Sequence, residues 1–343
     1  MRKTNDLRKA KEVQFDEWYT QRSDIDYELK HYRPHFKNQI VYCNCDDPKI
    51  SNFYRYFSDN FHRLALKHLI TTCYRNNEPD IFSKHKLENG VRLDCPRGEL
   101  IDGAYQPSVP VITELNGDGD FRSSECIEIL RSTDIVVTNP PFSKFQEYIT
   151  QLITNKKKFL ILGGAASVAT KNIFDFIQQG KVWLGTKSIS GGMYFDIPKW
   201  KQEEVLESGK KNGYTIKNGV VKKISPVVWY TNLDHHRRHE EMFLFRKYSK
   251  QKFPKYDNYD AIHVENVNDI PKDYPGEMGV PTTFVDKWNP DQFELVGTDR
   301  QVTKAKSGKQ SRFYLDGKEL FAKFVIRNKR IEKRECHAAE SDH

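Results

Sequence analysis

The sequence predicts an α/β protein with a doubly wound, mostly parallel sheet. Apolar, β-branched runs of strand length alternate with helical spacing up to about residue 190 of the 343-residue chain. This alternation is typical of a parallel sheet with helices on both faces. After that point the pattern changes to a hairpin and short strands. We therefore expect a C-terminal region of mixed α and β elements.

The elements of the first part follow in a regular order. Residues 75–110 are rich in polar residues, Gly and Pro, which indicates an insertion. Ser123 or Ser124 is the expected N-cap of a helix, and Gly163-Gly164 is expected to end a strand. Strand patterns lie at 40–43, 66–74, 134–138, 159–162 and 181–186, and helical patterns lie at 23–36, 49–61, 123–130, 144–154 and 173–179.

The second part contains a predicted hairpin at 215–223 with its turn at Asn218-Gly219. Further strand patterns lie at 226–231, 312–315 and 320–327. We expect four regions: a mobile basic arm over 1–14, a main domain over 15–200, a second region with the remaining strands over 201–335, and a tail over 336–343.

The composition is that of a soluble globular protein, with 37% hydrophobic and 30% charged residues. No apolar run approaches membrane-spanning length, and the charged N-terminus leads into no apolar signal segment. The net charge of +8 favours a polyanionic partner. The spacing of the cysteines is not that of a zinc site, so we expect reduced thiols in a cytoplasmic protein. There are six cysteines: Cys43, Cys45, Cys73, Cys95, Cys126 and Cys336.

The most informative motif is Asn139-Pro140-Pro141-Phe142, directly after the strand pattern at 134–138. Open α/β sheets bind ligands at the carboxyl ends of their strands, and the two prolines keep this backbone rigid. The Asn139 side chain and the Pro140 carbonyl offer acceptors for both hydrogens of an exocyclic amino group. Phe142 offers a flat face for a heterocycle. This arrangement suits methylation of an amino group by a methyl sulfonium; the alternative is a strand that ends at a proline turn.

The loop after the first strand, Asn44-Cys45-Asp46-Asp47-Pro48, is followed by Ser51 and Asn52. It lacks the glycines that cradle a diphosphate. A small cationic ligand near Asp46 or Asp47 fits better, and S-adenosylmethionine carries both an ammonium and a sulfonium group. A turn followed by a helix N-cap explains the same residues equally well.

Two more segments are candidates for the cofactor site. In the loop 116–121, Asp120 would accept a hydrogen bond from an adenine amino group, and Phe121 would stack on the ring. A calcium loop is not expected there because its twelfth position is Ile127 instead of Glu. In the segment Trp18–Gln21, a hydroxyl and an amide beside two aromatic residues would close over the carboxylate of the methionine part. The alternative for the loop 116–121 is a glycine-rich surface turn. The alternative for the other segment is a helix cap with core aromatics.

Basic residues gather toward the C-terminus. The segment His235–His239 is interpreted as a solvated or phosphate-facing segment, and no metal site is expected. The clusters after residue 303 mix charges with Gly and aromatic residues, which suits contact with DNA phosphates and bases. A solvated basic face has the same composition. The candidate DNA-binding residues are Lys304, Lys306, Lys309, Arg312 and Arg327.

Together these segments resemble the EcoRI-type adenine-specific DNA methyltransferases, over nearly the whole chain. The resemblance is carried by residues 16–21, 41–48, 51–53, 139–142, 279–281, 286–290 and 292–297. It implies a Rossmann-like methyltransferase sheet with a C-terminal α+β DNA-recognition region. It also implies S-adenosylmethionine as methyl donor and an adenine N6 in double-stranded DNA as acceptor, reached by base flipping.

By motif position, the resemblance places the catalytic pocket at Asn139, Pro140 and Phe142. The cofactor contacts that it implies are Tyr19, Thr20, Asn44, Cys45, Asp46, Pro48, Asn52, Asp120 and Phe121. We expect a monomeric modification enzyme of a restriction-modification system, or an orphan relative, with a cognate endonuclease as functional partner. The alternatives are an amino methyltransferase for cytosine N4, RNA or a glutamine amide, and a non-catalytic DNA-binding protein.

Overall fold

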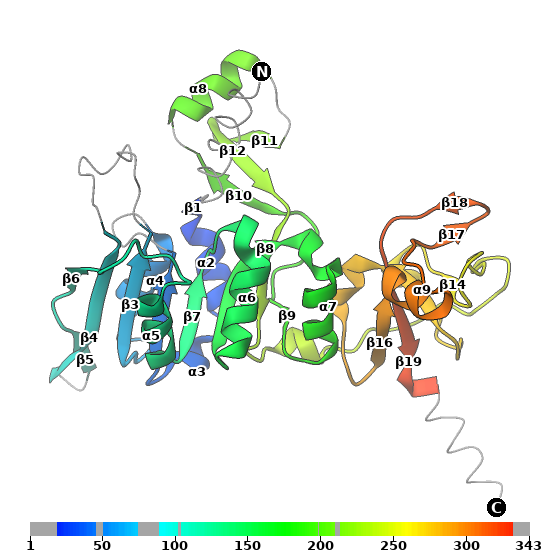
Figure 1. Ribbon diagram of the computed structural model, residues 1–343, viewed down its shortest axis with the longest axis horizontal. Coiled ribbons are helices and arrows are strands. Elements are labelled where there is room, and N and C mark those ends of the chain that lie inside the picture. The colour runs from blue at the N-terminus through cyan, green and yellow to red at the C-terminus, as the bar shows by residue number, and fades with distance from the viewer. Residues whose placement is uncertain are drawn as a thin grey trace, which may run out of the picture. The chain divides into compact units, whose positions relative to one another are not determined.

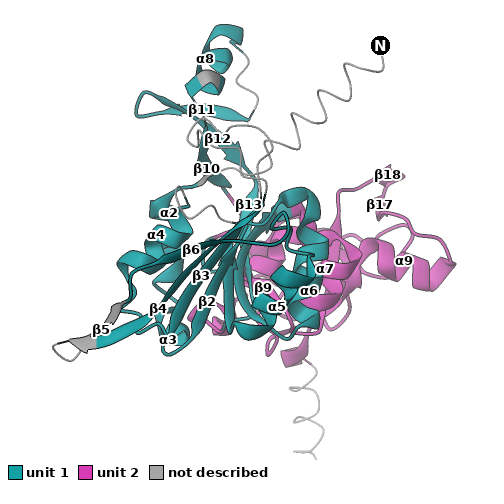
Figure 2. Cartoon of the chain, turned by 60° about the vertical axis from the view of Figure 1, so that its left-hand side comes forward, with its two compact units in different colours: residues 1–165, 185–187, 191–233 teal, residues 166–184, 188–190, 234–343 magenta. Residues whose placement is uncertain are grey.

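The computed structural model describes residues 19–45, 51–74, 89–101, 104–197, 199–209 and 213–331. They form two compact units, coloured separately in Figure 2. The first unit contains the described residues up to Ala165, together with Gly185–Lys187 and Gly191–Leu233. The second contains Ala166–Leu184, Ser188–Ser190 and the described residues from Asp234 onward.

The first unit is built on a large mixed sheet whose strands follow the order β5-β4-β3-β2-β7-β8-β13, with β6 paired to β4 (Figure 1). The four central strands β3, β2, β7 and β8 are parallel, whereas β4 and β13 run antiparallel beside them. The bounds are β2 (Ile40–Asn44), β3 (His68–Cys73), β4 (Val91–Ile101), β5 (Ala104–Pro107), β6 (Val111–Glu114), β7 (Ile135–Thr138), β8 (Lys158–Gly164) and β13 (Val227–Thr231).

The order of the central strands creates a ligand-binding edge. After β2 the chain adds β3 on one side, and it later returns to place β7 on the other side of β2. The strand order therefore reverses between β2 and β7. In open α/β sheets, ligands bind at the carboxyl ends of the strands at such a switch point.

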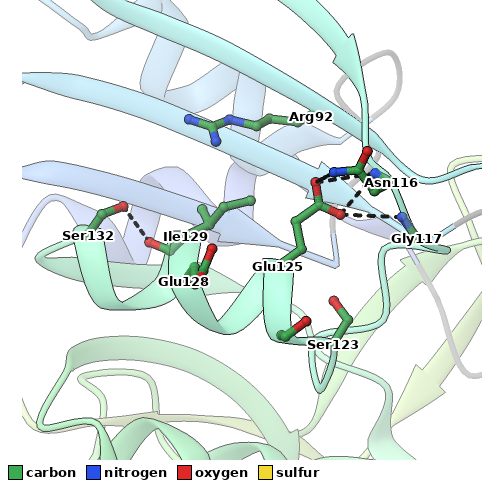
Figure 3. A pocket seen from close by; sticks show the side chains of 9 residues that line it. Arg92, Asn116, Gly117, Ser123, Glu125, Glu128, Ile129 and Ser132 are labelled. Atoms are coloured by element: carbon green, nitrogen blue, oxygen red, sulfur yellow. Dashed lines mark hydrogen bonds between the residues drawn. The ribbon is translucent and has the colours of Figure 1, made fainter.

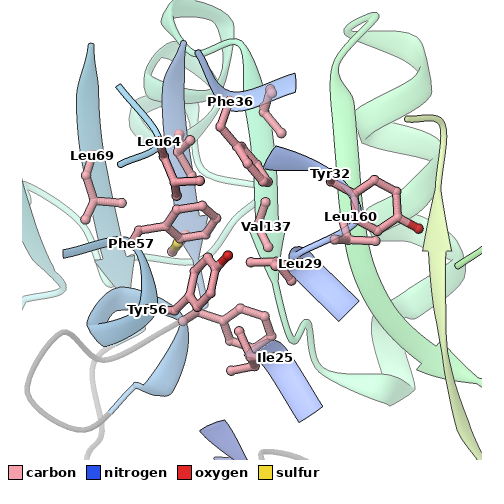
Figure 4. Close-up of a cluster of buried hydrophobic side chains, with 14 of the residues drawn as sticks. Ile25, Leu29, Tyr32, Phe36, Tyr56, Phe57, Leu64, Leu69, Val137 and Leu160 are labelled. Carbon is pink, nitrogen blue, oxygen red and sulfur yellow. The ribbon is translucent and has the colours of Figure 1, made fainter. Parts of the chain in front are cut away.

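Helices cover both faces of this sheet, as predicted (Figure 1). Helices α2 (Arg22–Leu29), α3 (Arg33–Phe36) and α4 (Asn52–Asp59) pack on one face, and α5 (Ser124–Ser132) and α6 (Phe145–Thr154) pack on the other. Figure 4 shows the hydrophobic core between α2, α3, α4 and the sheet, where Ile25 and Phe57 meet Val137 and Leu160 of the strands. Helices α5 and α6 begin within a residue of the predicted positions, and Ser123 is the N-cap of α5.

Two predictions about this part were wrong in detail. The predicted helix 23–36 is two helices, because Pro34 lies in the first turn of α3 and cannot continue α2. The strand β8 continues through Gly163-Gly164, because both glycines pair with β13 and the Phe145 ring fills the space beside Gly163.

A second, antiparallel sheet in the first unit has the order β1-β10-β12-β11. Its hairpin confirms the prediction, because Asn218 and Gly219 have φ values of 52° and 77°, as a tight two-residue turn requires. The bounds are β1 (Tyr19–Thr20), β10 (Met193–Asp196), β11 (Tyr214–Lys217), β12 (Val220–Ser225) and helix α8 (Lys199–Ser208).

The second unit contains the sheet β14-β15-β19-β16 and a two-stranded ribbon, β17-β18. Helix α7 packs against β16, where Gln178 Nε2 donates to the Leu295 carbonyl over 2.7 Å. The predicted strand 181–186 is only the two-residue β9. The bounds are α7 (Lys171–Gln178), β9 (Trp183–Leu184), β14 (Ile262–His263), β15 (Met278–Pro281), β16 (Phe293–Thr298), α9 (Asp299–Ser307), β17 (Tyr314–Leu315), β18 (Lys318–Glu319) and β19 (Lys323–Asn328).

Short 3-10 turns complete both units: η1 (Phe142–Lys144), η2 (Ala165–Ala169), η3 (His236–His239), η4 (Val267–Asp269) and η5 (Thr282–Lys287). Within the described ranges, none of the helices has the length and apolar character needed to cross a membrane.

Candidate functional site

The ends of β2 and β7 meet at the switch point of the large sheet. The Thr138 hydroxyl donates to the carbonyl of Asn44, so the two strand ends are tied together. The Tyr148 hydroxyl, from α6, donates to Oδ1 of Asn44. Asn139 follows directly and is buried, with 7% of its surface exposed. The sheet therefore places two asparagines side by side at the edge where ligands bind.

The Asn139–Phe142 motif connects β7 to α6 through the short turn η1. Pro140 is buried, and Phe142 is partly buried against the core. The Phe142 ring meets the Phe195 ring of β10 edge to face, with 6.5 Å between the centroids. Phe195 pairs in register with Thr20 of β1. The motif thus borders the small sheet as well as the large one.

Thr20 lies where β1 meets the N-terminus of α4. Its carbonyl accepts a hydrogen bond from Asn52 Nδ2 over 2.8 Å. Its hydroxyl is buried and has no hydrogen-bond partner among the residues that the structure describes. Ser51 caps α4, since its Oγ accepts from the backbone N–H groups of Phe53 and Tyr54. A buried hydroxyl beside a fixed amide fits the carboxylate and ammonium groups of a bound amino acid.

Only some of the residues predicted to contact the cofactor after β2 lie in the described part of the chain. Asp46 and Pro48 lie outside the described residues. Cys45 has a φ of 79°, in the left-handed region, and its N–H donates to the Thr72 carbonyl over 3.0 Å. Tyr19 belongs to β1 by its backbone. Asn44 ends β2 of the large sheet, and Thr20 ends β1 of the smaller sheet and contacts α4 through Asn52.

Two sets of hydrogen bonds hold the loop 116–121 that precedes α5. The Glu125 carboxylate accepts from the backbone N–H of Asn116 and of Gly117, and it lines a polar hollow of about 660 Å³ beside α5 (Figure 3). Asp120 is engaged by Arg122, which donates to both of its carboxylate oxygens at 2.8 and 2.6 Å. These hydrogen bonds hold the pKa of Asp120 below its ordinary value.

Phe121 is buried and lies between two neighbours. The Tyr148 ring meets it edge to face at 5.0 Å, and the Arg122 guanidinium lies 5.5 Å from its ring centroid. A heterocycle stacked on Phe121 would have to displace or adjoin Arg122. Tyr148, Arg122 and Phe195 were not predicted from the sequence as residues of this site. Only Tyr148 had a local signal, because it lies on the buried face of the helix that follows the motif.

The candidate DNA-binding residues fall into two groups. Lys304, Lys306 and Lys309 are exposed on and after α9. Arg312 instead forms an ion pair with the buried Asp299 at 3.0 Å. Arg327 pairs with Glu277 and Glu294, each at 3.0 Å. The three lysines face solvent, whereas the two arginines form ion pairs with carboxylates of the second unit.

The histidine segment forms internal contacts. His235 is buried, its Nε2 lies 2.8 Å from the Leu184 carbonyl, and burial lowers its pKa. His239 Nε2 lies 2.8 Å from Asp234 Oδ1. In the described ranges, no group of three or more His, Cys, Asp or Glu side chains is arranged to hold a metal ion.

Comparison with known proteins places the chain in a family. Residues 6–335 match the family model described as adenine-specific methyltransferase EcoRI. The chain is 43% identical to the Type II methyltransferase M.EcoRI of Escherichia coli over 332 residues, which cover 95% of this chain and 97% of that protein.

Two mycoplasma proteins are also similar. The Type II methyltransferase M.MgeORF184P of Mycoplasma genitalium is 37% identical, and M.MpnI of Mycoplasma pneumoniae is 35% identical, each over 84% of both chains. No solved structure matches this chain. The family match over nearly the whole chain and the 43% identity show that this chain belongs to the EcoRI family of adenine-specific methyltransferases.

Proposed function

We propose that this adenine-specific methyltransferase modifies adenine N6 in double-stranded DNA, with S-adenosylmethionine as the methyl donor. The observation that carries the proposal is the position of Asn139. It is buried directly after β7, at the switch point of the sheet, and Phe142 follows it in a rigid turn. The Type II names of the relatives support DNA as the substrate and a restriction-modification system as the setting.

The residues of the motif have distinct roles in this proposal. Asn139 Oδ1 and the Pro140 carbonyl accept hydrogen bonds from the two hydrogens of N6, and Phe142 stacks on the adenine ring. Extrusion of the base from the duplex costs a few kcal/mol, which the stacking and the hydrogen bonds offset. Positive charge develops on N6 during transfer, and fixed acceptors stabilise it more than the neutral amine. One such group contributes about 3–4 kcal/mol in other enzymes.

The cofactor site in this proposal borders the same edge. S-adenosylmethionine would supply the activated methyl group on its sulfonium. Thr20, Asn44, Cys45 and Asn52 would hold its amino-acid part, with Tyr19, Asp46 and Pro48 in adjoining segments. Asp120 and Phe121 would bind its adenine, which requires Arg122 to give up part of its contact with Asp120. No strong base is needed, because the methylated ammonium is acidic enough to lose its proton to water.

Target recognition is proposed to lie mainly C-terminal to the catalytic residues. In this proposal, residues 15–200 contain the catalytic site, and residues 201–335 complete the sheet and form the α+β recognition region. The exposed Lys304, Lys306 and Lys309 support this division, since lysines on a surface suit DNA phosphates. We propose that the protein acts as a monomer and that a cognate endonuclease is a functional partner.

A labelled-methyl assay tests the proposal. The purified protein is incubated with methyl-labelled S-adenosylmethionine in three separate reactions that contain duplex DNA, RNA or protein as the acceptor. The methylated product of each reaction is then identified. The proposal expects N6-methyladenine from duplex DNA only. Label in N4-methylcytosine, RNA or protein would identify a different acceptor. Tight DNA binding without cofactor binding would indicate a non-catalytic DNA-binding protein.

A further inference from the structure

Helix α6 contacts both loops that border the proposed cofactor site. Tyr148 and Gln151 are three positions apart, so they lie on the same face of the helix. The Tyr148 hydroxyl donates to Asn44 Oδ1 at the end of β2. Gln151 Nε2 donates to the Phe121 carbonyl over 3.0 Å. One helix therefore connects two loops that are far apart in the sequence.

The same helix is fixed to the acceptor side of the site. It begins directly after the Asn139–Phe142 motif and the turn η1. Tyr148 itself is fully buried, and its ring packs edge to face on Phe121. The core contacts of Phe145, Ile149 and Leu152 anchor the helix on the sheet. A shift of α6 would therefore move the motif and both cofactor loops together.

The contact with Tyr148 also determines the direction of the Asn44 amide. An amide has an acceptor end and a donor end, and the Tyr148 hydroxyl occupies the acceptor end. Among the residues that the structure describes, no acceptor for its NH2 end is found, so this end can donate to a ligand. An NH2 group suits a carboxylate, a hydroxyl oxygen or a ring nitrogen, all of which S-adenosylmethionine presents.

We propose that Tyr148 is a positioning residue for the cofactor: it turns the Asn44 amide so that its NH2 group donates to S-adenosylmethionine, while Gln151 holds the Phe121 loop. This inference rests on the proposed function, because it requires that Asn44 and Phe121 border the cofactor. Tyr148 does not touch the reacting atoms. It acts through Asn44, and its effect is on cofactor binding before any DNA is present.

Tyr148→Phe removes the hydroxyl and keeps the ring contact with Phe121. The matched control is Tyr230→Phe, because Tyr230 is also fully buried, packs on Phe145 of the same helix and donates its hydroxyl to the Gly164 carbonyl over 2.8 Å. Calorimetry without DNA should show that Tyr148→Phe raises the Kd for S-adenosylmethionine about tenfold. The control should stay within about twofold of wild type, as should the DNA affinity of both variants.

A double-mutant cycle separates positioning from a general structural effect. Because Tyr148 acts through Asn44, Tyr148→Phe should change the Kd less than about twofold in an Asn44→Ala background. A full additional tenfold loss in that background would overturn the proposal. So would equal Kd values for Tyr148→Phe and Tyr230→Phe.

If the melting temperature shows that Tyr148→Phe does not fold, Gln151→Leu decides. It acts on the other loop from a half-buried position, and it should raise the Kd about threefold or more. An unchanged Kd in a folded Gln151→Leu protein would then overturn the proposal. Wild-type protein that does not bind S-adenosylmethionine would contradict the proposed function itself.

Discussion

Gly163→Ala should displace helix α6 and so lower both stability and methyl transfer. A methyl group at Gly163 would lie 2.3 Å from Cε2 and 2.5 Å from Cζ of Phe145, far inside van der Waals contact. The Phe145 ring has little room to move, because Tyr230 packs against it with 4.7 Å between the centroids. The strand is also fixed, since Gly163 pairs with Val228. The added atom therefore has to push Phe145 and the helix that carries it.

The size of the effect follows from this geometry. Overpacking a rigid core by one methyl group costs about 1–3 kcal/mol, because side chains leave their rotamers or the backbone moves. For a unit of this size, about 2 kcal/mol lowers the melting temperature by about 4–8 °C. The helix also carries Tyr148 and Gln151 and follows the Asn139–Phe142 motif, which we propose to bind the acceptor. Methyl transfer should therefore fall more steeply than the folded fraction.

Calorimetric melting and single-turnover methyl transfer measure the two effects. The control is Gly117→Ala, because a methyl group there meets nothing within 4 Å, and the melting temperature should hold or rise slightly. The double variant Gly163→Ala, Phe145→Leu should recover part of both losses, since the smaller side chain makes room for the methyl group. A wild-type melting temperature for Gly163→Ala would refute this prediction. So would a double variant in which the losses of the two single substitutions simply add.

Three further perturbations test charges on the surface and in the interior. Replacing Lys304 and Lys306 of α9 and the following Lys309 by Ala should reduce the log–log salt slope of DNA binding by about 0.9 per lost phosphate contact; an unchanged slope would mean that these lysines only face water. Arg312→Ala should instead cost about 3–5 kcal/mol of stability, because it removes the ion-pair partner of the buried Asp299 carboxylate; a wild-type melting temperature would contradict this. Burial raises the pKa of Glu28 above its ordinary 4.5, so its ionisation lowers stability as pH rises from there toward the folded pKa. The melting temperature of Glu28→Gln minus that of wild type should therefore increase with pH over that window, and a constant or falling difference would argue against it.

The parts of the fold that the sequence predicted are those that local patterns determine. Buried parallel strands are continuous apolar runs, so 40–43 and 134–138 were recognisable, and Ser123 marked the start of α5 through its hydroxyl. The Asn218-Gly219 turn was equally clear, because few residues adopt two successive positive φ values. The motif at Asn139 could be placed because it directly follows such a strand.

The remaining features depend on partners that are distant in the sequence. Arg312 and Arg327 read as DNA contacts by composition, but their carboxylate partners Asp299, Glu277 and Glu294 come from other elements. The contact between Tyr148 and Asn44 spans 104 positions, and no local pattern predicts it. Gly163 was taken as the end of a strand because glycine often stops strands. Its actual role is to leave room for Phe145, which only the packing reveals.

The most direct test of the catalytic assignment is a single-turnover methyl-transfer measurement on Asn139→Ala, combined with its affinity for S-adenosylmethionine. If Asn139 holds the acceptor nitrogen, transfer to duplex DNA should fall about 10²–10³-fold, as when one fixed charge-stabilising group is removed. The affinity for the cofactor should change less than about twofold, because Asn139 would contact the acceptor and not the donor. A variant that keeps more than about a tenth of wild-type turnover, or that loses cofactor binding in proportion to activity, would contradict the account.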